Sequence, residues 1–410
     1  MGTGEFEPSP EEVSRFVPVA LTKPVLAAAL GIDGGVIFQI LAVENLGLSP
    51  AAIGTAFGLG LISLPFQLWA GRMPLRLAKR NVQIFLVLAA IQSAFLAWLL
   101  AVGATGGFAA TALVVTVTAE VTISVLYVTA WQPLLSTRVT TRDRQRINAG
   151  WNALGRGLLA GFLIVFSAVE VTGRALLLVV LSLIAIGAAA SLRRITVVDP
   201  RILTTSQRQP LKKPLHLSSG MWWILLSFTT LNLGALPLWL VYLSQVMWPT
   251  ANLGVIGAIQ TISIVAALIA WRTTDGALGR RAIIGVLLTL GGSVALLGVG
   301  RVADSAGERT AVLIVTVVMT FGMMYASLAL LEMAHRLVLE QDHVVRVFTL
   351  LDVVDSSSLQ LGLFVGGLLA TWSAGVLDWT PYVAFVVTMS ALAVVSVVCT
   401  ALLTRSSARG

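Results

Sequence analysis

Charged residues are scarce in this sequence. Only 11% of its 410 residues are charged, against roughly 25% in an ordinary soluble domain. The chain is 57% hydrophobic and its mean hydropathy is +0.91. So little charge cannot cover a water-exposed surface of this size, and we therefore expect the lipid bilayer to surround most of the chain.

Cysteine and catalytic motifs are also missing. Cys399 is the only cysteine, which excludes a disulfide framework and a thiolate metal site. The motifs G-x-S-x-G and H-E-x-x-H and the P-loop are absent, so we predict neither an enzyme nor an ATP-driven pump, and no cofactor. One predicted loop is rich in acidic and histidine residues, but solvation explains them without a metal: Glu332, His335, Glu340, Asp342 and His343.

The net charge of +8 does not indicate nucleic acid, because the basic residues form no single patch interleaved with exposed aromatics. They fall instead between long apolar stretches. Twelve such stretches are long enough to cross a bilayer, at residues 17–43, 50–70, 82–103, 108–132, 149–169, 175–192, 221–247, 252–271, 282–300, 311–333, 347–371 and 381–403. The sequence therefore predicts an all-α, multi-pass membrane protein with twelve transmembrane helices.

The basic residues also predict the orientation of these helices. On the side of the two termini lie 23 lysines and arginines, whereas the opposite side has only Arg174, Arg301 and Arg309. Because basic loops stay in the cytoplasm, we predict that both termini are cytoplasmic, in a plasma or inner membrane.

The sequence pattern predicts two related halves. A polar stretch with three prolines, residues 193–220, separates an N-terminal six-helix bundle (1–192) from a C-terminal one (221–410). The halves correspond at an offset of about two hundred residues, in the pairs Gly34 and Gly234, Pro50 and Pro249, Gly54 and Gly254, Lys79-Arg80 and Arg280-Arg281, and Arg146 and Arg346. A duplicated unit around a central cavity is common in secondary transporters.

Among the ionisable residues inside the apolar stretches, five are candidate site residues: Asp33, Glu120, Arg156, Asp352 and Asp355. A charge at membrane depth costs several kcal/mol unless it faces protein or water, so each of them marks a candidate pathway. The pattern predicts a transporter whose partners are a small-molecule solute and protons.

Asp33 is flanked by glycines at positions 31, 34 and 35, which let a neighbouring helix approach. Burial without a cation favours the neutral form of a carboxyl. That behaviour suits a group that binds a proton on one side of the membrane and releases it on the other. A fixed ion pair, or a cap at an unwound turn, is the alternative.

Glu120 shares a predicted helix face with residues spaced by three or four positions: Thr116, Ser124, Tyr127 and Trp131. A carboxylate beside aromatic rings suits a cationic or amphipathic solute, through charge and cation–π attraction. The alternative is that Glu120 is a structural partner of Arg156.

Arg156 is the one basic residue deep inside a predicted helix, and it shares a face with Asn148 and Asn152. It either binds an anionic solute or neutralises Glu120 or Asp33.

Asp352 and Asp355 are three residues apart, so they project from one side of a helix. They lie near its cytoplasmic end, which leaves two interpretations. Either they contact the solute, or they form a gating ion pair with Arg336 or Arg346.

Residues 71–80 read GRMPLRLAKR, which resembles the signature G-x-L-A-D-R-x-G-R-R between helices two and three of the major facilitator superfamily. Residues 275–281, DGALGRR, resemble a second copy. The resemblance covers most of the chain and implies a monomer. It also implies a cytoplasmic gating role for Gly71, Arg72, Arg76 and Arg80 in the first copy and for Asp275, Gly279, Arg280 and Arg281 in the second.

The sequence departs from this family in places. Leu75 replaces the acidic residue of the first signature, and Ala78 replaces its second glycine. Two marks of drug/proton antiporters are absent, the R-x-x-x-G pattern in helix four and a Gly-Pro pair in helix five.

Three functional hypotheses follow. The first is alternating access that exports an amphipathic small molecule against protons, with Asp33 and Glu120 as the responsive acids. The second is proton-coupled uptake of a small, possibly anionic solute held by Arg156. The third is a relative without transport activity that serves as an assembly or sensor partner.

Overall fold

The computed structural model describes residues 14–30, 35–70, 77–136, 146–195, 218–234, 243, 248, 250–274, 277–299, 305–339, 344–376, 391 and 394–402. All regular structure in these residues is helical. The first part contains α2 (Val17–Leu30), α3 (Val36–Ile40), η2 (Leu41–Asn45), α4 (Pro50–Leu59), η3 (Gly60–Ser63), α5 (Leu64–Ala70), α6 (Ala78–Ala101), α7 (Gly106–Ser136), η5 (Arg146–Trp151), α9 (Asn152–Ala168), α10 (Val171–Ser191) and η6 (Leu192–Arg194). The second contains α12 (Ser219–Gly234), α14 (Leu253–Thr273), α15 (Leu278–Val299), α16 (Ala306–Leu339), α17 (Val344–Val376) and helical residues 394–402.

Six of the described helical segments are long and apolar enough to cross a membrane: Ala78–Ala101, Gly106–Ser124, Val171–Ser191, Leu253–Thr273, Leu278–Ala295 and Ala306–Ala334. Shorter apolar helices, among them Asn152–Ala168 and Val353–Leu369, accompany them. The predicted class, an all-α multi-pass membrane protein, is confirmed.

Several helices are capped at their N-termini by side chains that accept hydrogen bonds from free backbone N–H groups. The side chains of Ser49 and Asn252 each accept a hydrogen bond from the backbone three residues later, at the starts of α4 and α14. Pro50 occupies the first helical position of α4, where its missing N–H costs nothing. Ser305 and Glu308 form a reciprocal capping box at the start of α16.

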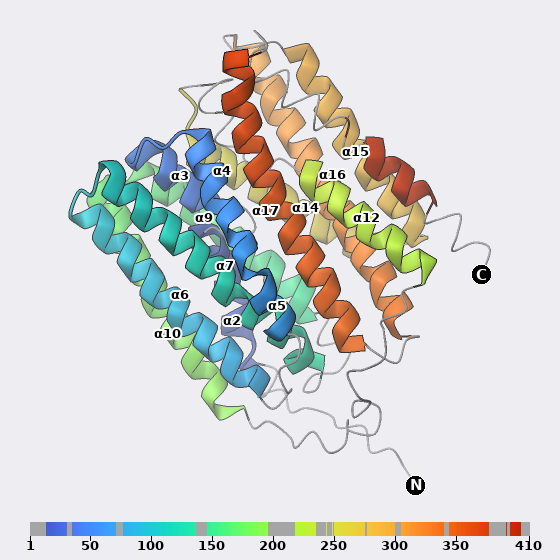
Figure 1. Cartoon of the computed structure of the whole chain (residues 1–410), viewed down its shortest axis with the longest axis horizontal. Helices are drawn as coiled ribbons and strands as arrows, with labels where there is room; N and C mark the ends of the chain where they lie inside the picture. Colours follow the sequence, from blue (N-terminus) through green and yellow to red (C-terminus); the bar gives the residue numbers. More distant parts are fainter. Residues whose placement is uncertain are drawn as a thin grey trace.

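Figure 1 shows the first part, from α2 to α10, on one side and the second part, from α12 to α17, on the other. The second part meets the first along two of its helices: α17 contacts α4, η3, α5 and α7, and α14 contacts α9 and α3. One hydrophobic core lies mainly in the first part and includes Leu253, Ile256 and Leu363 from the second. A separate core fills the second part between α12, α15, α16 and α17.

Large apolar side chains also cover the outside of the bundle. Ile91 and Trp98 on α6, Leu176 and Leu183 on α10 and Ile269 on α14 are all exposed. In water this surface would promote association, whereas in a bilayer it matches the acyl chains.

The antiparallel helices define two ends of the molecule. We call the end with loops 46–49, 102–105 and 169–170 the distal end, and the opposite end, where α6 and α15 begin, the proximal end. Gly47 and Gly103 have φ values of 59° and 62° in two distal loops, a region that other residues rarely adopt.

One local prediction needs correction. The sequence analysis put Glu332 and His335 in a loop, but α16 continues to Leu339 and both residues are helical. Charged and polar residues can extend a helix beyond the bilayer at little cost, because water there satisfies their side chains.

Candidate functional site

Glu120 is fully buried in α7 (0% exposed). In the orientation of the Gln92 amide that satisfies both groups, the Gln92 nitrogen donates to Glu120 Oε2, and the Gln92 oxygen accepts from the backbone N–H of Glu120 at 3.3 Å. Glu120 Oε1 has no hydrogen-bond partner, and no basic side chain in the described part of the chain forms an ion pair with this carboxyl. A bare carboxylate here would cost several kcal/mol.

The neighbours of Glu120 place it inside the first bundle rather than between the two parts. Gln92 belongs to α6, whose flanking residues Ile91 and Phe95 are exposed on the outer surface. In the described part of the chain, the Glu120 carboxyl does not contact Arg156, so the ion pair considered in the sequence analysis does not form in this conformation.

Tyr127 lies two turns from Glu120 on α7 and is 3% exposed. Its ring stacks on Trp131, with centroids 5.3 Å apart, and packs against Phe85 of α6 at 5.1 Å. The ammonium of Lys23 in α2 lies 5.2 Å from the centre of the Tyr127 ring. Lys23 lies in the second turn of α2.

Asn152 and Arg156 lie on α9, and both are half-buried. Arg156 precedes Leu163 by seven residues, or two turns, so both share one helix face. Leu163 contacts Gly254 and Gly257 of α14. The Arg156 side chain therefore starts on the face of α9 that meets the second part of the chain.

Asp355 is exposed on α17 and accepts a hydrogen bond at Oδ1 from Nδ2 of Asn232 in α12, at 2.5 Å. The same amide lies 3.3 Å from Ser358 Oγ. Asn232 itself is buried, with 5% exposure. This cluster joins a solvent-reachable carboxylate to a buried amide, whose N–H satisfies one oxygen of the carboxylate.

Other predicted site residues cannot be located in the same way. Asp33, residues 71–76 and Asp275 lie outside the described residues, and the side chain of Asp352 is also not described. The structure therefore gives no geometry for Gly71, Arg72 and Arg76.

The remaining signature residues lie at the proximal end. Arg80 and Arg280 are exposed in the first turns of α6 and α15, and Gly279 is half-buried beside Arg280. The guanidinium of Arg281 lies 4.7 Å from the Trp271 ring centre, and its Nη1 is 3.4 Å from the Trp271 carbonyl oxygen. Arg281 thus fastens α15 to the end of α14 within the same half.

Lys79 makes the corresponding contact in the first half. Its Nζ donates to the carbonyl oxygens of Arg193, at 2.8 Å, and Ile195, at 2.5 Å. These carbonyls lie where η6 ends, so Lys79 fastens the first turn of α6 to the first residues of the predicted linker.

The two parts of the chain touch closely at four glycines near the distal end: Gly54, Gly58, Gly254 and Gly257. A Cβ on Gly54 would lie 2.8 Å from the carbonyl oxygen of Leu363, and one on Gly58 would lie 2.7 Å from the ring of Phe364. On the other side, a Cβ on Gly254 would lie 2.6 Å from the carbonyl oxygen of Leu163. Real Cβ atoms essentially never approach so closely, so these positions require glycine in this conformation.

Gly54 and Gly254 are one of the pairs that sequence comparison of the halves identified. Each lies in the first two turns of its helix, α4 or α14, and each contacts the opposite part of the chain. These two residues, about two hundred positions apart in the sequence, therefore make equivalent contacts in the two parts of the chain.

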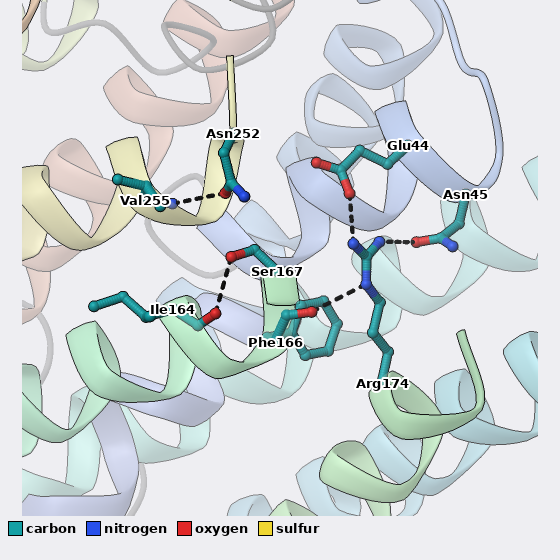
Figure 2. Close-up of polar contacts among 8 residues, drawn as sticks. All are labelled: Glu44, Asn45, Ile164, Phe166, Ser167, Arg174, Asn252 and Val255. Atoms are coloured by element: carbon teal, nitrogen blue, oxygen red, sulfur yellow. Dashed lines mark hydrogen bonds and ion pairs between the residues drawn. The ribbon is translucent and has the colours of Figure 1, made fainter. Parts of the chain in front are cut away.

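The structure also reveals a charged group that the sequence analysis did not select. Arg174, in the first turn of α10, forms an ion pair with Glu44 (Nη2 to Oε2, 2.8 Å) and donates to Asn45 Oδ1 at 3.0 Å. Its Nε donates to the carbonyl oxygen of Phe166 at 3.0 Å. Figure 2 shows Arg174 between these partners. The sequence did offer a signal for Arg174, because it is one of only three basic residues on the side opposite the two termini.

No family model and no curated protein matches this sequence. Solved structures do match. A crystal structure of the nucleoside transporter NupG aligns with 96% of this chain and 99% of its own, with a TM-score of 0.64 and 13% identity. The chain has the major facilitator fold. The fold implied by the resemblance of its signature loops is thereby confirmed.

The same fold relates the chain to metal transporters. A bacterial metal transporter aligns with 96% of this chain and 97% of its own, at a TM-score of 0.58 and 12% identity. A bacterial homologue of the iron transporter ferroportin, in an inward-facing state, also aligns with 96% of this chain and 97% of its own. Its TM-score is 0.62 and its sequence identity is 14%. The matched structures are transporters of chemically different substrates, so the fold alone does not choose a substrate.

Proposed function

We propose that this chain is a secondary transporter that exports an amphipathic small molecule in exchange for protons. Two six-helix halves, residues 1–192 and 221–410, alternate access to a cavity between them, and residues 193–220 link the halves. The protein acts as a monomer in the plasma or inner membrane with both termini in the cytoplasm, the orientation that the basic residues favour.

The observation that carries this proposal is the environment of Glu120. Its carboxyl is fully buried, receives one hydrogen bond from a neutral amide, and has a second oxygen without a partner. A neutral carboxylic acid fits this environment, whereas a carboxylate would need water or a cation. A conformational change that admits either one would release the proton, which is the property that coupling requires.

The contacts between the halves support alternation. Gly54, Gly58, Gly254 and Gly257 all contact the opposite half near the distal end. These contacts favour a conformation in which the two halves are closed against each other at the distal end.

In this proposal Asp33 binds the second proton or the solute, and the exposed Asp355 attracts a positively charged part of the solute. Asp352 lies three residues from Asp355 and adds negative charge at the same helix. Tyr127 supports the Glu120 helix by packing, because its ring is enclosed by Phe85 and Trp131.

The test is transport in proteoliposomes with an imposed pH gradient. Glu120→Gln keeps the hydrogen bond to Gln92 but cannot exchange a proton, so gradient-driven transport should be lost while solute exchange without a gradient persists. Asp33→Asn is tested in the same way. Glu170→Gln is the matched control, because Glu170 is exposed in a distal loop and its side chain makes no capping bond. Gradient-driven transport that survives in both buried-acid variants would falsify this assignment.

Arg156 favours a second candidate, proton-coupled uptake of a small anionic solute. Its side chain starts on the α9 face that meets α14, where an anion between the halves would lie. Under this alternative Arg156→Ala abolishes accumulation of the solute, whereas Asp33→Asn uncouples it from protons. Accumulation that persists without Arg156 excludes the anion site.

A further inference from the structure

Arg174 joins three chain segments at the distal end. Each of its terminal nitrogens and its Nε has a different acceptor: Glu44 and Asn45 at the end of η2, and the carbonyl oxygen of Phe166 in the last turn of α9. Its side chain is only 11% exposed, and its guanidinium lies 5.4 Å from the Phe166 ring centre. Arg174 makes three charge-assisted contacts and is largely buried, so it specifies the relative position of these segments.

The contact with Phe166 has a clear local cause. α9 ends at Ala168, so its last carbonyl groups have no partner within the helix. A positive charge at a helix C-terminus is favourable both as a donor and through the helix dipole. Arg174 supplies this charge from the next helix while its other nitrogens hold η2.

The segments that Arg174 joins also form the surface on which α14 docks. Gly254 contacts Ser167 and Leu163 in α9, and Gly257 contacts Leu163 and Val36. Val36 belongs to α3, which continues directly into η2. Figure 2 shows Ser167 and the start of α14, at Asn252 and Val255, beside the Arg174 group.

We propose that Arg174 is a positioning residue of the outer gate. It holds η2 and α3 against α9 in the first half, so that α14 of the second half closes on a preformed surface. When the gate opens, α14 leaves this surface while the Arg174 contacts remain within one half. Loss of Arg174 therefore shifts the equilibrium towards the outward-open conformation. The inference rests on the proposed alternation between two conformations, but not on the identity of the solute or of the coupling ion.

The experiment measures how fast a cysteine in the docking surface reacts. Ser167→Cys, on a Cys399→Ser background, introduces one thiol that the start of α14 partly covers in the closed state, because Gly254 lies against Ser167. The reconstituted protein is treated from outside with a membrane-impermeant maleimide. Arg174→Gln should accelerate labelling several-fold, because a docking surface that is no longer preformed must be ordered each time α14 closes on it.

Two further variants make the result specific. Glu44→Gln removes the ion pair but leaves an amide that accepts a hydrogen bond, so labelling should rise less than with Arg174→Gln. Arg272→Gln is the matched control, because Arg272 is an exposed arginine at the other end of α14. Its labelling rate should equal that of the background protein.

The outcomes separate this inference from the proposed function. Unchanged labelling in folded Arg174→Gln protein overturns the inference, even if proton-coupled transport is found. If Arg174→Gln does not fold, unchanged labelling in Glu44→Gln has the same meaning. Faster labelling in a protein that transports nothing supports the gate and overturns only the proposed function.

Discussion

Adding one methyl group at Gly54 or Gly254 should open the distal end of the protein. A Cβ at Gly54 would lie 2.8 Å from the Leu363 oxygen and 3.0 Å from Gly367 Cα, both of them backbone atoms that cannot rotate away. At Gly254 the new atom would lie 2.6 Å from the Leu163 oxygen. The helices must therefore separate, or the closed conformation must bear the strain.

The size of the effect follows from the cost of overpacking. Inserting a methyl group into a close-packed contact costs about 1–3 kcal/mol, which shifts a two-state equilibrium about 5- to 150-fold. The open conformation escapes this cost because the halves have parted there. Gly54→Ala and Gly254→Ala act on the same equilibrium from two sides, so their effects on its free energy should add.

Spin labels provide the measurement. Thr105→Cys and Thr310→Cys, on the Cys399→Ser background, place one label on each half at exposed distal positions. Pulsed electron–electron double resonance then measures the distance between the two spin labels. Each alanine variant should enlarge the population with long distances. Gly161→Ala is the control, because a Cβ there meets nothing within 4 Å. If the folded alanine variants give the same distances as this control, the close glycine contacts do not stabilise the closed state.

Three other variants test the contacts within each half. Gln92→Leu removes the amide that serves the buried Glu120, so the melting temperature in detergent should fall by an amount equivalent to about 1–3 kcal/mol; an unchanged melt would mean that another group takes over. Asn232→Leu should lower it less, because Asp355 reaches solvent and water replaces the lost donor. Lys79→Met should lower the melting temperature by an amount equivalent to about 0.5–1.5 kcal/mol, because it removes two hydrogen bonds of a half-buried ammonium. It should also speed proteolytic cleavage of the linker, and equal cleavage rates would contradict the contact to η6.

The sequence was most informative where the physical signal was local and strong. Apolar stretches predicted the helices closely: residues 175–192 correspond to α10 (Val171–Ser191), and residues 252–271 to α14 (Leu253–Thr273). Bilayer thickness sets the length of such stretches, so composition alone finds them. The polar end of α16 was missed because hydropathy ends where the bilayer does, while the helix does not.

The site was harder to predict because its contacts join distant parts of the chain. The stripe around Glu120 was read correctly as one helix face, but nothing local indicates that Gln92 of another helix approaches it. Nothing local indicates that Glu44 pairs with Arg174, because the two residues are far apart in the sequence. The pairing of Gly54 with Gly254 was visible from the repeat, yet its meaning required the contacts across the two halves.

The contact of Lys79 with the end of η6 has a mechanical consequence. The connecting segment leaves the first half at a point that is bonded to the beginning of α6. In the proposed alternation, a pull transmitted along the connection would therefore act on α6 and α10 together, instead of on α10 alone. Shortening the connection should then restrict how far the halves can tilt, without loosening either of them.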